Sequence, residues 1–225
     1  MPTAAHTFED AALLLRAAVN AFAPRRLAIP GFRPAAVLIP LLRRPGGPTL
    51  LFTRRTETVE QHKGQICFPG GRCEDAEEAR AGALREAFEE VALEPAAVEV
   101  LGTLDDYPSI SGYIVTPVVG LVREPPAGFR PQETEVQECL EIPLARLLDS
   151  TRLRVELWET DRLPSGAFFD QLRGFQERLG DIDQVTGRHR IYFFDAFGDP
   201  ERVVWGLTAR ILKGLLERAF GFVEC

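Results

Sequence analysis

The chain has few residues of the kinds that build zinc sites or disulfide frameworks. Its 225 residues include only three histidines and four cysteines, and no two cysteines form a Cys-x-x-Cys pair. This pattern argues against a zinc site and favours reduced, mostly buried thiols in a cytoplasmic protein. The sequence also lacks an apolar run long enough to cross a bilayer, an N-terminal secretion signal, internal repeats and low-complexity segments.

Positive charge is also in deficit, because the formal net charge is −7. Nucleic acids and membrane surfaces are polyanionic and favour basic patches, so neither is an expected partner. A small anionic substrate remains compatible, since a bound metal can reverse the local charge. The composition, 45% hydrophobic and 26% charged, is that of a globular protein with a substantial core. The sequence leaves the oligomeric state open.

Alternating and helical periodicities interleave along the chain and predict an α/β protein. A mixed sheet enclosed by helices in α/β/α layers is the expected arrangement. The segment 24–34 reads as a linker, the turn 43–48 should close a hairpin, and 160–188 has no clear periodicity. Helices are expected over 8–22, 75–93, 143–148 and 203–220, and strands over 35–42, 49–54, 66–68, 98–104, 113–122, 138–142, 152–158 and 191–194.

The helix expected over 75–93 carries a cluster of acids. Glu86, Glu89 and Glu90 stand at positions i, i+3 and i+4, so their carboxylates share one helix face and repel each other. Arg85 can neutralise only part of this charge. Hard oxygen ligands beside the glycine turn that ends at Gly71 are what Mg2+ requires. A metal held there would stabilise charge on a diphosphate oxygen and lower the pKa of a bound water. The alternative is a solvated acidic helix face.

The spacing over the whole stretch separates these interpretations. It resembles the Nudix box, whose fixed residues are a glycine, a glutamate, an Arg-Glu pair, a Glu-Glu pair and a final glycine followed by an apolar residue. Two positions depart from the box, because Ala87 is smaller than the usual apolar residue and Ala92 replaces the final glycine. The residues in register are Gly71, Glu77, Arg85, Glu86, Glu89, Glu90 and Leu93.

The resemblance implies a Nudix fold and assigns roles to these side chains. Glu86 and Glu90 would be the main ligands of Mg2+ or Mn2+, and Glu89 would be a further ligand or the base. Arg85 would orient the glutamates, and Glu77 would stabilise the turn before the helix. The Gly70 carbonyl could add a ligand. Residues 35–225 would form the Nudix domain with an elaboration at about 160–188, and residues 1–34 would pack on it as a helix and linker.

The flanking sequence is similar to the coenzyme A pyrophosphatase subfamily of Nudix hydrolases. That resemblance implies hydrolysis of coenzyme A, and of its oxidised or acylated forms, to adenosine 3′,5′-bisphosphate and 4′-phosphopantetheine. Val59-Glu60 stands where that subfamily has Leu-Arg, so ADP-ribose or another nucleoside diphosphate derivative is the alternative substrate. A binding module without turnover is the third hypothesis. The matching segments are 51–56, 62–65, 68–71, 111–120, 135–136, 143–144 and 205–209.

Six further residues are candidates outside the box. Glu135 could be an additional ligand or base, with Glu133 as its rival. His62 and Gln65 could contact substrate or brace their loop. Arg55 could meet a phosphate, and Tyr113 could stack on a base, although solvation of the arginine and core packing of the tyrosine are the alternatives.

Overall fold

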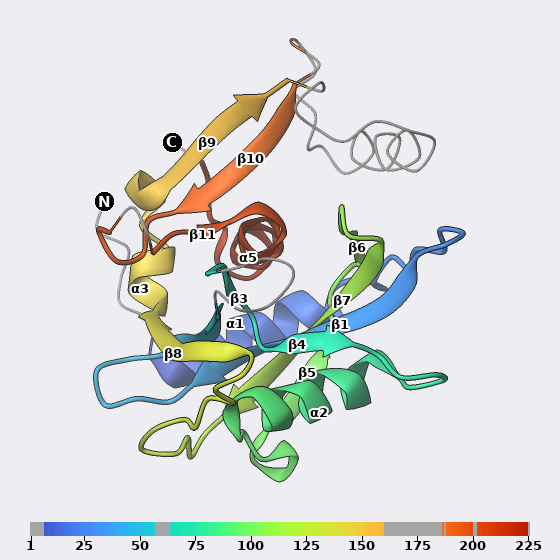
Figure 1. Ribbon diagram of the computed structural model, residues 1–225. Coiled ribbons are helices and arrows are strands. Elements are labelled where there is room, and N and C mark those ends of the chain that lie inside the picture. Colours follow the sequence, from blue (N-terminus) through green and yellow to red (C-terminus); the bar gives the residue numbers. More distant parts are fainter. Residues whose placement is uncertain (1–6, 57–63, 160–185, 187, 200–201, 225) are drawn as a thin grey trace.

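The computed structural model describes residues 7–56, 64–159, 186, 188–199 and 202–224 (Figure 1). Within them the chain forms an eight-stranded mixed sheet and a separate three-stranded sheet. Helices cover both faces of the larger sheet, as an α/β Nudix fold requires. The elements include β3 (Ile66–Cys67), β5 (Glu99–Thr103), β6 (Tyr107–Pro108), β8 (Val136–Pro143), α3 (Leu144–Leu147) and two 3-10 turns (Pro95–Ala97 and Ser150–Arg152).

Two parallel strands form the centre of the larger sheet. β1 (Arg33–Leu42) pairs along its whole length with β7 (Tyr113–Val122), from Arg33 opposite Tyr113 to Leu42 opposite Val122. Both strands are rich in Val, Leu and Ile and are buried on both faces, as expected for the interior of a parallel arrangement. This rigid pair supports the loop at which the acidic helix begins.

The hairpin predicted around 43–48 forms only next to its turn. β2 (Thr49–Arg55) pairs with β1 only at Leu41 and Leu42, and further along this edge it pairs with β3, while its other edge pairs with β8 from Thr49 to Arg55. The freed edge of β1 is taken by β4 (Gly70–Arg72), a strand that the sequence analysis did not predict. The two paired segments of β1 therefore bring β4 close to the end of β2.

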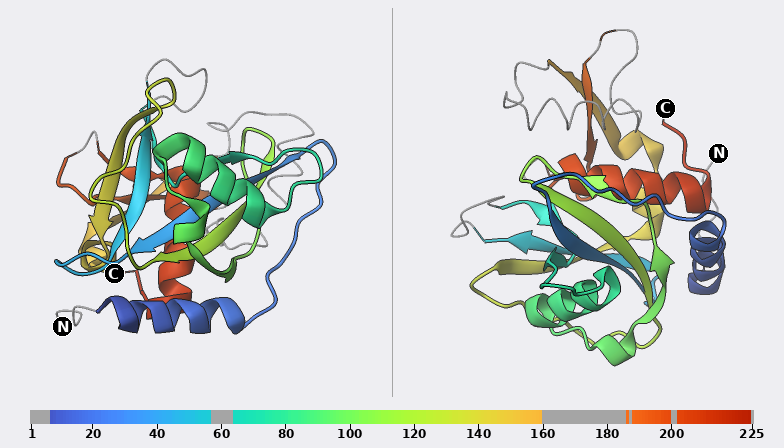
Figure 2. Two further views of the ribbon diagram at one scale, coloured as in Figure 1. Left: turned by 90° about the horizontal axis from the view of Figure 1, so that it is seen from below. Right: turned by 90° about the vertical axis from the view of Figure 1, so that its right-hand side faces the viewer.

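Figure 2 shows the helices on opposite sides of the larger sheet. α2 (Ala79–Val91) lies on one side and packs Ala83, Ala87 and Val91 against β1 and β7. α5 (Gly206–Phe220) lies on the other side, and α1 (Phe8–Asn20) packs against α5 and β5. Within the described residues, no helix combines the length and apolar character needed to cross a membrane.

The second sheet stands beyond α5 and consists of β9 (Leu153–Trp158), β10 (His189–Phe194) and β11 (Val204–Trp205) (Figure 1). One of its faces sends Tyr192, Phe194 and Val204 into the main core. Most of the elaboration predicted at 160–188 lies outside the described residues.

Two helix starts were predicted too early. α2 begins at Ala79 and not at 75, because residues 74–77 form a turn in which Ala76 has a φ of 62°. α5 begins at Gly206 and not at 203, because Val204 and Trp205 extend the second sheet. In both places helix-favouring composition was overridden by pairing or turn formation.

Candidate functional site

The site is built around two glycines that are needed for different reasons. Gly70 has a φ of 151°, and a Cβ there would lie 2.3 Å from the Ala36 carbonyl oxygen. Gly71 has ordinary backbone angles, but its Cβ would lie 2.5 Å from Oε2 of Glu86. The first glycine lets β4 pack against β1, and the second leaves room for a carboxylate against the backbone.

Arg85 holds the turn and the acidic face together. Its Nε and Nη2 donate to the two oxygens of Glu77, both at 3.0 Å. Its Nη1 donates to Glu86 at 3.0 Å and to Glu89 at 3.1 Å. The bidentate pair lowers the pKa of Glu77, which also accepts a hydrogen bond from the backbone amide of Glu74. The orienting role that the resemblance implies for Arg85 stays a prediction.

Glu90 is the most deeply buried acid of the cluster, with 4% of its surface exposed. Burial raises the pKa of its carboxyl to about 7, against the opposing effect of the Gly70 amide. That amide donates to Glu90 Oε2 at 3.1 Å, and Nη1 of Arg55 lies 3.9 Å from Oε1. The sequence analysis did not foresee this contact between Arg55 and Glu90.

Charge repulsion shows which carboxylates share the site. The pKa of Glu86 is raised first by burial and also by Glu89 and Glu135. Glu135 likewise raises the pKa of Glu90. The choice between Glu135 and its rival Glu133 stays a prediction. Side-chain exposure is 55% for Glu89, which leaves that carboxylate at the open edge of the cluster.

The remaining predicted substrate residues lie at different places. Gln65 lies beside Arg55, because the backbone carbonyl of Gln65 accepts a hydrogen bond from the Arg55 backbone amide at 3.0 Å. Tyr113 instead packs against the main core at the start of β7, where the Arg33 guanidinium lies 4.6 Å from its ring centre. His62 lies outside the described residues.

The carboxylates fit a divalent cation by their chemistry. They are hard oxygen donors, the negative charge of Glu86 raises the pKa of Glu90, and the missing side chain of Gly71 lets the Glu86 carboxylate lie against the backbone. As the side chains stand, no group of three acids, histidines or cysteines among the described residues is close enough to enclose an ion. Small rotations of these side chains would be needed to enclose an ion, and the individual ligands stay predictions.

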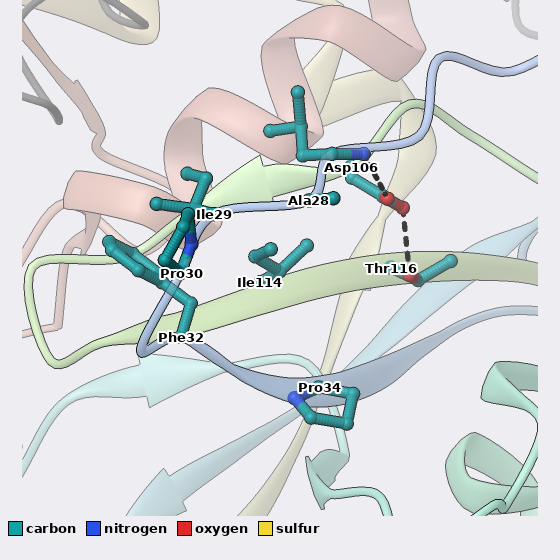
Figure 3. A pocket seen from close by; sticks show the side chains of 9 residues that line it. Ala28, Ile29, Pro30, Phe32, Pro34, Asp106, Ile114 and Thr116 are labelled. Atoms are coloured by element: carbon teal, nitrogen blue, oxygen red, sulfur yellow. Dashed lines mark hydrogen bonds between the residues drawn. The ribbon is translucent and has the colours of Figure 1, made fainter.

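A separate cavity of about 530 Å³ lies under the linker that precedes β1 (Figure 3). Ile114 and Thr116 point into it from β7, and Ile29 covers it. The buried carboxylate of Asp106 accepts hydrogen bonds from the Leu27 amide and from the Thr116 hydroxyl, and Arg26 donates to it as well. The polar groups of the lining are thus used within the fold, and the cavity offers mainly apolar surface.

Comparison with known proteins agrees with this architecture. The sequence profile of the NUDIX domain matches residues 32–162. The chain is also 51% identical over 185 residues to the Nudix hydrolase NudL of Escherichia coli K12, itself described as uncharacterized, and the match covers 81% of each chain. The chain therefore belongs to the Nudix hydrolase family. Members of this family are pyrophosphohydrolases that act on small diphosphate-containing substrates and generally use divalent metal ions.

Solved structures resemble the chain more distantly. The Nudix hydrolase RenU of Mycobacterium smegmatis aligns with a TM-score of 0.44 at 21% identity, over 70% of this chain and 92% of its own. The Caenorhabditis elegans Ap4A hydrolase aligns with a TM-score of 0.42 at 19% identity, over 66% and 98% respectively.

Proposed function

We propose that the chain hydrolyses the diphosphate of coenzyme A, or of its oxidised or acylated forms, with Mg2+ or Mn2+. The products would be adenosine 3′,5′-bisphosphate and 4′-phosphopantetheine. The observation that carries the proposal is the position of Arg55. This residue ends the Leu-Phe-Thr-Arg-Arg run that resembles the coenzyme A pyrophosphatase subfamily, and its guanidinium lies beside the buried Glu90.

Arg55 is suited to bind a phosphate group. Its side chain is 26% exposed, and its buried Nε has no hydrogen-bond partner among the described residues. Nη1 lies beyond hydrogen-bond distance of Glu90, so the donors of its planar group remain available. A phosphate oxygen would satisfy these donors in the two-pronged geometry that guanidinium groups favour. Arg55 would thereby orient the scissile linkage over Gly70 and Gly71.

The acids divide the remaining work. Glu86 and Glu90 would hold the metal, with the Gly70 carbonyl as a further oxygen donor. A bound divalent ion would supply charge neutralisation at the diphosphate and a lower pKa for bound water. Glu89 and Glu135 flank this position and are the two candidates for accepting the proton of the attacking water. Through its hydrogen bonds to both carboxylates, Arg85 would keep Glu86 and Glu89 on the helix face that binds the metal.

ADP-ribose or another nucleoside diphosphate derivative is the second candidate substrate. The observation that favours it is Glu60, an acid where the coenzyme A subfamily has a basic residue. A negative charge there would disfavour the additional 3′-phosphate that coenzyme A carries. A binding module without turnover is the third possibility, and the retention of Glu86, Glu89 and Glu90 speaks against it.

The test is a substrate panel with purified protein and Mg2+ or Mn2+. Formation of adenosine 3′,5′-bisphosphate from coenzyme A, with a larger kcat/KM than for ADP-ribose, would support the proposal. Glu90→Gln should abolish turnover, whereas Glu94→Gln, an exposed acid just beyond the helix, should leave it unchanged. Faster cleavage of ADP-ribose would select the second candidate. Tight coenzyme A binding without cleavage under either metal would select the third.

A further inference from the structure

The acid Glu135 is carried by a compact turn that one side chain organises. Oε1 of Gln132 accepts hydrogen bonds from the amides of Thr134 and Glu135, both at 3.0 Å, and from the Thr134 hydroxyl at 2.6 Å. The backbone carbonyl of Gln132 also accepts hydrogen bonds from the backbone amides of Glu135 and Val136, at 3.0 and 2.8 Å. A single glutamine thus fixes the backbone on both sides of Glu135.

The same turn is attached to the two elements that carry the other candidate groups. The Gln132 amide donates to the carbonyl of Glu90 at 2.8 Å, at the end of α2. On the other side, the amide of Thr56 donates to the Glu135 carbonyl at 3.0 Å. Thr56 follows Arg55, whose guanidinium faces the Glu90 carboxylate. These contacts form a closed ring that connects α2, the turn that carries Glu135 and the end of β2.

We propose that Gln132 is a positioning residue that holds the Glu135 carboxylate in working position beside Glu86 and Glu90. It acts through the backbone of the turn and touches no reacting atom. The inference rests on the proposed function, because it assumes that Glu135 takes part in diphosphate cleavage. The turn itself is exposed, so water can replace the lost acceptor and the fold should tolerate substitution of Gln132.

The experiment compares Gln132→Met, which keeps the length of the side chain and removes its acceptor, with Gln132→Glu, which keeps an acceptor oxygen. Gln132→Met should lower kcat about tenfold with little change in KM, because a small displacement of a catalytic group is costly. Gln132→Glu should retain most of the turnover. Gln137→Met is the matched control, since this exposed glutamine makes no side-chain hydrogen bond within the described part of the chain.

Combination with Glu135→Gln separates positioning from general damage. If Gln132 acts through Glu135, the double variant should be no slower than Glu135→Gln alone. Losses that multiply would overturn the proposal, and so would wild-type turnover in Gln132→Met.

Amide hydrogen exchange gives a readout that needs no substrate. The amide of Thr134, which donates to the Gln132 side chain, should exchange faster in Gln132→Met and at the wild-type rate in Glu135→Gln. The Glu135 amide keeps the backbone carbonyl of Gln132 as an acceptor and serves as the internal reference. Mn2+ affinity, measured by electron paramagnetic resonance, should weaken in both single variants and no further in the double variant. These two measurements decide the role of Gln132 even if the chain cleaves no diphosphate at all. Unchanged exchange in Gln132→Met would overturn the proposal by itself.

Discussion

Gly71→Ala should disable the site while leaving the fold intact. The new Cβ would lie 2.5 to 2.8 Å from three atoms of the Glu86 carboxyl group, well inside normal contact distance. The backbone of Gly71 needs no positive φ, so alanine introduces no conformational strain there. The carboxylate is the end of a flexible side chain, and it would have to retreat by about 1 Å. A displacement of that size costs about 100-fold in rate, or about 2.7 kcal/mol in transition-state stabilisation.

Steady-state kinetics on the substrate chosen by the panel, together with a Mn2+ titration, would measure the effect. Gly128→Ala is the matched control, because a Cβ there would meet no atom within 4 Å. We expect Gly71→Ala to lower kcat/KM and Mn2+ affinity while its melting temperature stays close to that of Gly128→Ala. Wild-type turnover and metal affinity in Gly71→Ala would refute the reasoning, because they would mean that Glu86 does not need its position against Gly71.

Three other perturbations test the fold around the site. Ala92→Gly should raise the free energy of unfolding by about 1 kcal/mol, because Ala92 has a φ of 55° at the end of α2. The same change at Ala81, which is exposed and lies within the helix, should lower the free energy of unfolding by about 1 kcal/mol. Chemical denaturation of both variants would measure these two opposite changes. Asp106→Ala should lower the free energy of unfolding by about 2 kcal/mol, since buried donors lose their acceptor, and an unchanged denaturation midpoint would contradict this. Burial raises the pKa of the Cys67 and Cys139 thiols to about 11. Iodoacetamide should therefore modify both thiols slowly at pH 8 and faster as the pH approaches 11, which peptide mass spectrometry would measure. Rapid modification at pH 8 would argue against burial of these thiols.

The layered fold could be predicted from the sequence because its strands and helices carry clear periodicities. The prediction was wrong where pairing depends on partners distant in the chain. The turn at 43–48 favoured a full hairpin, yet β2 leaves β1 after two residue pairs, and the same edge of β1 pairs with β4, where Gly70 fits closely against Val37. No local pattern announces β4, because glycines rarely favour strands. Only the assembled sheet makes that pairing favourable.

The acidic face of the site was predictable for a different reason. Helical periodicity alone places Glu86, Glu89 and Glu90 together. The approach of Arg55 and of Glu135 could not be derived in this way, since both lie on other elements and reach Glu90 only through the sheet. Gln132 carried no signal at all, because turn-organising side chains are usually shorter, such as Asn or Asp. The positions of Arg55, Glu135 and Gln132 relative to the acidic helix therefore depend on contacts between segments that are distant in the sequence.

If the site binds metal and a diphosphate as proposed, its charge balance should couple the two binding steps. The carboxylates that gather around Gly71 outnumber the guanidinium groups of Arg55 and Arg85, and burial of Glu90 opposes further negative charge. A diphosphate brings more negative charge to this position, and Arg55 alone cannot offset it. Each divalent cation should therefore strengthen substrate binding, and by linkage the substrate should strengthen cation binding by the same factor. At a pH well above 7, where Glu90 with its pKa of about 7 is ionised, a Glu90→Gln variant should bind coenzyme A more tightly than the wild type does when metal is absent. Equal affinity of the two proteins without metal would mean that these carboxylates do not face the diphosphate.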